Sequence, residues 1–270
     1  MSTHSSEREV AVLVTAISII LLASPPCAGQ EARGIVERME SAVGGRERLR
    51  ALKDIQYEYT YHDEGTGQRD VSLERYVFDG ELSWGRYAIH QKHIHPDLAG
   101  EIVQGYDGSS SWATLEGKPL TAPEAVKLAY LARKTNYYWF AMMFKLLDTG
   151  VTHEYGGTRK VDGIDYDIVT IGFEEGVGDS RDTFVLYVNP ETGLVDQFLF
   201  TARAMGGTEP RLMRVRYRDV EGLRLPVHRS YTAADWDGTI TGSTWTRQVI
   251  RDIKFGNGFD RSLFAPPKPD

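Results

Sequence analysis

Most of the chain alternates between apolar and polar residues with a period of two, which is the spacing of a strand with one buried face. In residues 55–61, Ile and three Tyr share one face, while Gln, Glu and Thr share the other. Turn sequences separate such runs: the Asp-Gly pairs ending at Gly80, Gly108, Gly163 and Gly238, and the segment 189–193. The pattern predicts about ten or eleven strands, mostly sequential neighbours, and therefore an antiparallel meander.

Two segments instead have the spacing of helices. Residues 31–43 repeat apolar side chains every three or four positions and stop at Gly44-Gly45, and residues 46–52 continue by a turn or two. The second helix is predicted to begin with a capping box formed by Thr121 and Glu124 and to end near Gly150. Because no linker-like segment divides the middle, residues 30–270 are predicted to form one domain.

The N-terminal segment has the features of an export signal. Residues 10–23 are apolar except for one Thr and one Ser, a run too short to span a bilayer but typical of the apolar part of a signal peptide. The small residues at 27–29 suit cleavage before Gln30. We therefore expect a signal peptide over residues 1–29, a periplasmic or extracellular location, and no transmembrane segment in the mature chain. A membrane-anchoring helix and lipid attachment at Cys27 are the alternatives.

Composition and charge exclude several classes of function. The chain is 41% hydrophobic and 26% charged, as in ordinary globular proteins. A net charge of −7 opposes binding to phosphate backbones, so no nucleic-acid partner is expected. The single Cys excludes a disulfide framework and a multi-cysteine metal site. The common nucleotide-binding and hydrolase motifs are missing from the sequence, so no cofactor and no catalytic residue are assigned.

Residues 137–144, Tyr-Tyr-Trp-Phe-Ala-Met-Met-Phe, depart from the usual pattern of a surface helix. A helical segment with no polar face must be covered on all sides. It is either packed between the sheet and a second helix, or it faces the sheet on one side and a cavity for an apolar ligand on the other. Met142 and Met143 fit the second interpretation, because Met adapts readily to irregular apolar surfaces.

Four features follow one another in an order that resembles the LolA-like superfamily, the periplasmic lipoprotein carriers and their relatives. They are a leading helix before the Tyr-rich strand 55–61, an Asp-Gly-x-x-x-Trp pattern at 107–112, a hairpin ending at 192–198, and a closing Phe-Ala-Pro-Pro at 264–267. The resemblance implies a mainly β (α+β) fold. A single curved antiparallel sheet would form a half-barrel with helices in its concave side, enclosing an apolar cavity.

The resemblance also implies a ligand: an apolar small molecule, lipid or acyl chain, with a lipoprotein or another envelope protein as a possible partner. The Arg-Pro step that follows the carriers' second strand is missing at 82–87, so no lipoprotein-transfer residue is assigned. The candidate ligand-binding residues are Tyr57, Tyr59, Trp84, Trp112, Tyr138, Phe140, Met142, Met143 and Phe144.

Two other functions stay open at this point. The same half-barrel, with a filled core, could serve as a protein-interaction module, whereas a pocket of a few hundred Å³ would favour ligand binding. The chain could also be a metal-dependent hydrolase, because His90, His93, His95 and Asp97 supply imidazole and carboxylate groups that can bind zinc.

Overall fold

The computed structural model describes residues 28–178 and 182–267, so nearly all of the predicted signal peptide lies outside the described residues. The helices are α1 (Ala28–Ala42), α2 (Arg46–Ala51) and α3 (Pro123–Ala141), with the 3-10 turns η1 (Met142–Phe144), η2 (Arg203–Met205) and η3 (Arg261–Leu263). The first six strands are β1 (Asp54–Asp63), β2 (Arg69–Val77), β3 (Leu82–His90), β4 (Ile102–Tyr106), β5 (Ser111–Leu115) and β6 (Lys118–Pro119). The others are β7 (Val151–Val161), β8 (Ile164–Phe173), β9 (Phe184–Val188), β10 (Val195–Ala202), β11 (Gly207–Val220), β12 (Leu223–Ala233) and β13 (Thr246–Phe255).

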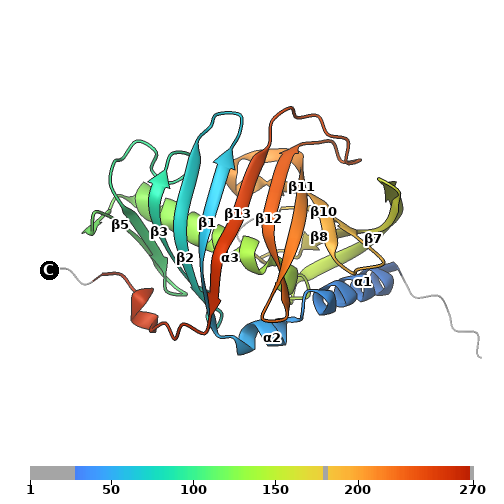
Figure 1. Ribbon diagram of the computed structural model, residues 1–270, viewed down its shortest axis with the longest axis horizontal. Coiled ribbons are helices and arrows are strands. Elements are labelled where there is room, and N and C mark those ends of the chain that lie inside the picture. The colour runs from blue at the N-terminus through green and yellow to red at the C-terminus, as the bar shows by residue number, and fades with distance from the viewer. Residues whose placement is uncertain (1–27, 179–181, 268–270) are drawn as a thin grey trace, which may run out of the picture.

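In the described part of the chain, thirteen strands form one sheet in the order β6-β5-β4-β3-β2-β1-β13-β12-β11-β10-β9-β8-β7. All neighbouring strands are antiparallel, and only the β1–β13 pair joins strands distant in sequence. The chain therefore builds outward from β1 to one edge at β6, and then returns from the other edge at β7 to β13. Helix α3 connects these two edges, so it has to cross the sheet, and Figure 1 shows it passing behind the middle strands.

The predicted fold, a single curved antiparallel sheet with helices in its concave side, is confirmed. The sheet has more strands than predicted, partly because β6 consists of only two residues, one of them Pro119. A strand this short shows no alternation of apolar and polar residues in the sequence. Among the described residues, no helix combines the length and apolar character needed to cross a membrane.

The predicted helices are present, with differences at their ends. Helix α1 starts at Ala28, three residues before its predicted start, and the chain turns away at Gly44. Gly44 has a φ of +104°, and a Cβ there would lie 2.6 Å from the carbonyl oxygen of Gly222, so only Gly fits. The predicted capping box is wrong: the residue before the first turn of α3 is Ala122, no side chain caps that turn, and Pro123 begins the helix.

The two faces of the sheet carry separate apolar clusters. On the concave face, α1, α3 and η1 pack against inward-pointing residues of most strands to form the main core. On the convex face, a cluster around Leu82, Trp84 and Phe264 is covered by the C-terminal segment. A second convex cluster around Tyr187 and Leu199 packs against Ala234, which follows β12.

Candidate functional site

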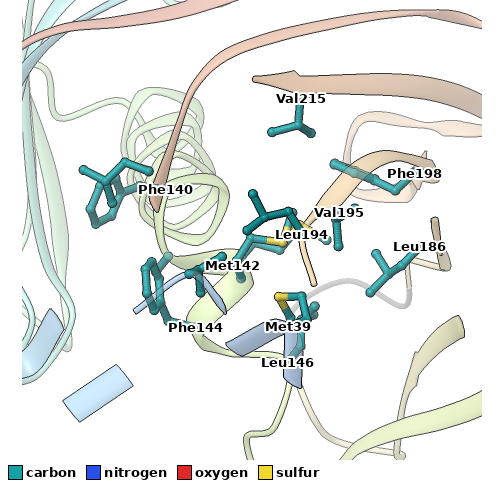
Figure 2. Close-up of a cluster of buried hydrophobic side chains, with 14 of the residues drawn as sticks. Met39, Phe140, Met142, Phe144, Leu146, Leu186, Leu194, Val195, Phe198 and Val215 are labelled. Carbon is teal, nitrogen blue, oxygen red and sulfur yellow. The ribbon is translucent and has the colours of Figure 1, made fainter. Parts of the chain in front are cut away.

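Most of the aromatic stretch 137–144 is packed core. Phe140, Met142 and Phe144 are each at most 3% exposed and belong to the concave core. The Phe140 ring centroid lies 5.7 Å from that of Tyr57 and 6.1 Å from that of Phe78. Figure 2 shows Met142 and Phe144 in the cluster that also contains Met39 of α1 and residues of β9, β10 and β11. This part of the stretch fills the hollow of the sheet.

Tyr138 and Trp139, in contrast, line a pocket of about 350 Å³ that runs along α3. The Phe184 ring of β9 lies 6.2 Å from the Tyr138 ring and 6.1 Å from the Trp139 ring, centroid to centroid. Other walls come from strands on both halves of the sheet: Tyr106 at the end of β4, and Phe173 and Ala202 at the ends of β8 and β10. The pocket therefore lies between the two halves of the curved sheet, and its lining is mainly aromatic and aliphatic.

Three charged residues that line this pocket, Glu81, Lys145 and Asp148, are paired with one another, and we call this part of the lining the rim. Lys145 forms ion pairs with Glu81 and with Asp148, the latter at 2.9 Å, and Asp148 also lies 3.1 Å from Arg46. Burial lowers the pKa of Lys145, but its hydrogen bonds to the two carboxylates outweigh burial and leave the pKa raised. The hydroxyl of Tyr138 is buried with no hydrogen-bond partner among the described residues. The pocket thus combines a mainly apolar lining with an ion-pair network at Lys145, and Lys134 and Asp182 also contribute to the lining.

Of the nine predicted ligand-binding residues, Tyr138 lines this pocket. Met143 is buried in the core with the other residues of η1. Tyr57 and Tyr59 are on the concave face, where the Tyr57 hydroxyl donates a hydrogen bond to that of Tyr76 at 2.9 Å, and Tyr59 is half-buried. The helix and first-strand candidates therefore lie on the concave face, the same side of the sheet as the pocket, but most of them pack against each other.

Trp84 and Trp112 lie elsewhere, on the convex face. The alternation of β3 turns Ser83 and Gly85 toward α3 and hence Trp84 away from it. The Trp112 indole nitrogen donates a hydrogen bond to the carbonyl oxygen of Phe264 at 2.7 Å. The Asp-Gly-x-x-x-Trp pattern and the closing Phe-Ala-Pro-Pro segment therefore meet in one outer cluster, on the other side of the sheet from the pocket.

A buried ion pair, which the sequence analysis missed, attaches α3 to the sheet. Arg133 of α3 and Glu74 of β2 are both fully buried and form two hydrogen bonds, at 2.7 and 3.3 Å. Tyr76 and Ser72 donate further hydrogen bonds to the Glu74 carboxylate, at 3.0 and 2.6 Å. A Cβ at Gly85 would overlap the Arg133 guanidinium, so this Gly makes room for it. The feature of the sequence that could have indicated this ion pair is Arg133 itself, an Arg at one of the apolar positions of the predicted helix.

The histidine-rich segment does not assemble a metal site. The ring nitrogens of His90 lie 3.2 Å from the carbonyl oxygen of His95 and 2.7 Å from that of Gly100. His93 faces the Asp70 carboxylate at 3.4 Å. Within residues 28–178 and 182–267, no group of three or more His, Cys, Asp or Glu is placed to hold a metal ion. The geometry therefore gives the hydrolase alternative no support.

A larger pocket, of about 660 Å³, lies between α2, the β2–β3 turn and the C-terminal segment. Arg50, Lys53, Asp79 and Glu81 supply much of its lining. Because its walls are charged and it does not lie along α3, it does not match a site for an apolar ligand.

Sequence comparisons identify no protein of established function. A model of a family of unknown function (DUF6503) matches residues 122–223, a segment that runs from α3 to the first residue of β12. A search of curated proteins finds no match to the chain.

Solved structures match the chain over most of its length. A DUF1329 family protein from Desulfovibrio piger is 12% identical, with a TM-score of 0.54 over 88% of this chain and 97% of that one. A LolA superfamily protein from Nitrosomonas europaea is 11% identical, with a TM-score of 0.52 over 87% and 97%. A putative outer membrane lipoprotein-sorting protein domain from Vibrio parahaemolyticus is 10% identical, with a TM-score of 0.50 over 87% and 97%.

The chain has the LolA-like fold. At these levels of identity the likeness concerns the fold alone. In the LolA-like half-barrel of this chain, α3 fills the concave side, and the apolar pocket runs along that helix.

Proposed function

We propose that this protein binds the acyl chain of a lipid in the pocket along α3. The observation that carries the proposal is the pocket itself, whose volume of about 350 Å³ and aromatic walls are those of a site for an apolar ligand. The LolA-like fold supports the proposal, because one of the matched structures is described as a lipoprotein-sorting protein domain. A free lipid and the acyl chain of a lipoprotein are both sources of such a ligand.

The composition of the pocket favours the chain of the ligand over any charged group. Each methylene removed from water contributes about 0.8 kcal/mol to binding. The ion pairs that Lys145 forms at the rim leave little net charge to attract an ionic ligand there. Binding by the pocket would therefore depend on the length of the apolar chain.

We also propose that the protein is exported, on the basis of the apolar run at residues 10–23 and the small residues at 27–29. N-terminal sequencing of the protein recovered from the periplasmic or extracellular fraction of a bacterial host tests this. We expect a mature chain that begins at Gln30, whereas an intact chain that starts at Met1 in the cytoplasmic fraction would contradict it.

Titration calorimetry with dodecanol, an uncharged ligand with a single acyl-like chain, tests binding in the pocket. Ala202 lies at the pocket wall, so Ala202→Trp fills part of the pocket and should weaken binding at least about tenfold. Ala88 of β3 is exposed, and Ala88→Trp is the matched control that should bind like the wild type.

Two results would reject the proposal. One is no heat of binding for the wild-type protein, and the other is equal affinity of Ala202→Trp and wild type. The first would leave the protein-interaction module as the better interpretation of the fold.

A further inference from the structure

The concave face carries a buried cation, Arg229, that has no anionic partner among the described residues. Arg229 of β12 is 5% exposed, and it forms no ion pair with any carboxylate of the described residues. Its Nε is buried with no hydrogen-bond partner in that part of the chain. A buried charge without a partner is unfavourable, so a side chain kept in this state is a candidate for binding a ligand of opposite charge.

One edge of the guanidinium has a structural role. Nη1 donates a hydrogen bond, at 2.5 Å, to the carbonyl oxygen of Trp139 in the last turn of α3. A cation at this position is stabilised by the helix dipole, which places about half a negative charge at the C-terminal end. The opposite edge, which carries Nε, is the edge that binds a carboxylate through two parallel hydrogen bonds.

Two polar, uncharged side chains, those of Gln248 and Tyr59, are neighbours of Arg229. Gln248 of β13 is paired in register with Arg229, and its buried Oε1 also has no partner among the described residues. Burial raises the pKa of Tyr59, which keeps its hydroxyl protonated as a donor, and the nearby Arg229 charge opposes this rise. The side-chain amide of Gln248 can present its NH₂ group instead of its oxygen after a half-turn.

Two carboxylates that, like Arg229, act electrostatically on Tyr59 already have other partners. Glu74 is held by Arg133. Asp70 accepts hydrogen bonds from the backbone amides of Lys92 and His93, at 2.8 and 3.0 Å. The protein therefore supplies the cation and hydrogen-bond donors of an anion site, and the described chain does not supply the anion.

Trp139 connects Arg229 to the pocket. Its ring lines the pocket, and the guanidinium carbon of Arg229 lies 5.8 Å from the ring centroid. The Phe200 ring lies 5.2 Å from that of Trp139 and 5.5 Å from that of Tyr231, so the aromatic wall continues from the pocket to β12. Arg229 itself does not line the pocket, and Trp139 is the residue in contact with both. A ligand whose inner end extends past the Trp139 ring would therefore meet the Arg229 guanidinium.

We propose that Arg229 binds the carboxylate of the ligand, and that the ligand class is a long-chain carboxylic acid whose apolar chain occupies the pocket along α3. This inference rests on the proposed function of that pocket. It assigns the head-group site to a position on the concave face and not to the rim, where the charges are already paired.

Calorimetry with two ligands that differ in the head group, dodecanoate and dodecanol, tests the inference. Because hydrogen bonds to charged groups contribute about 1.5–3 kcal/mol, the wild-type protein should prefer dodecanoate by at least about tenfold. Arg229→Gln should remove this preference and keep the affinity for dodecanol, which also shows that the variant is folded. Arg216→Gln, an exposed Arg of β11, is the matched control and should keep the preference.

The outcomes separate the inference from the function it rests on. Equal affinity of the wild type for both ligands, or a preference that survives Arg229→Gln, would overturn the inference and leave the pocket intact as an acyl-chain site. Binding of neither ligand by the wild type would reject both. If Arg229→Gln does not fold, NMR of dodecanoate labelled at its carboxyl carbon provides the test on the wild-type protein. Binding should lower the pKa of the dodecanoate carboxyl. An unchanged or raised pKa would overturn the inference.

Discussion

Glu74 and Arg133 are fully buried, and each depends on the other for its charge to be tolerated. Burial lowers the pKa of Arg133, but the Glu74 carboxylate outweighs burial and raises it. The pair joins α3 to β2 at the point where the helix crosses the sheet. Single residues of this kind decide where the helix sits, because the apolar contacts around it have no directional preference.

The ion pair yields a prediction for stability. Arg133→Met leaves the Glu74 carboxylate buried without its cation and should lower the free energy of unfolding by about 3–5 kcal/mol. Glu74→Gln added to this variant should restore much of the loss. Urea denaturation measures the coupling energy between Arg133 and Glu74 when it is applied to the wild type, the two single variants and the double variant. An Arg133→Met protein as stable as the wild type would contradict this account.

At the residue scale, the sequence predicts which side chains share a face of a strand, but not what covers that face. Alternation shows that Trp84 and Tyr57 each lie on one face of a strand, but it does not show which segment covers that face. The C-terminal segment covers the face of Trp84, and α3 covers the face of Tyr57. Phe173 and Phe184, which line the pocket, look like ordinary core residues in the sequence, because only the packing around α3 leaves space beside them.

At the scale of elements, the pattern predicted the strands, the turns between them and the two long helices. The Asp-Gly turns and the 189–193 turn all lie between successive strands, because their backbone requirements are local and fixed by one or two residues. The start of α3 was predicted incorrectly, since Pro123 fixes the first turn without a side-chain cap. The path of the C-terminal segment could not be predicted, because it is set by contacts distant in sequence.

That C-terminal segment is an element whose role can be tested separately from binding. Phe264 is fully buried against Trp84, so Phe264→Ala should lower the free energy of unfolding by about 3–5 kcal/mol. Because the cluster lies on the convex face, the variant should bind dodecanol with the affinity of the wild type at a temperature where it is folded. Loss of binding by the folded variant would show that Trp84 and Trp112 belong to the binding site after all.

Asp54 attaches the same segment to β1 in a pH-dependent manner. Burial raises the pKa of Asp54, but hydrogen bonds donated by Asn257, Gly258 and Phe259 outweigh burial and hold it below its ordinary value. A lowered pKa means that the stabilisation is present above about pH 4 and is lost as the pH falls through the pKa of the folded protein.

Asp54→Asn should therefore lower the free energy of unfolding by about 1–2 kcal/mol near neutral pH. The difference from the wild type should shrink as the pH falls below about 4. Urea denaturation at a series of pH values measures this. A difference that stays constant across the series would show that the carboxylate charge is not the stabilising feature.

At the scale of the whole molecule, the chain order produces the site. The strands from β1 to β6 and from β7 to β13 form the two halves of one sheet, and α3 must cross from one edge to the other. Its inner side fills the hollow, and its remaining surface forms the pocket with residues from both halves. The half-barrel and the position of the helical stretch were predictable from the sequence, whereas the division of that stretch into a packed side and a pocket side was not.

The most direct test of acyl-chain binding is a crystal structure of the protein with dodecanol that carries bromine at its terminal carbon. The anomalous signal of bromine locates the end of the chain independently of any model of the ligand. We predict a bromine peak in the pocket bounded by Tyr138, Phe173 and Phe184. A peak outside this pocket, or a fully soaked crystal without a bromine peak, would contradict the proposed function.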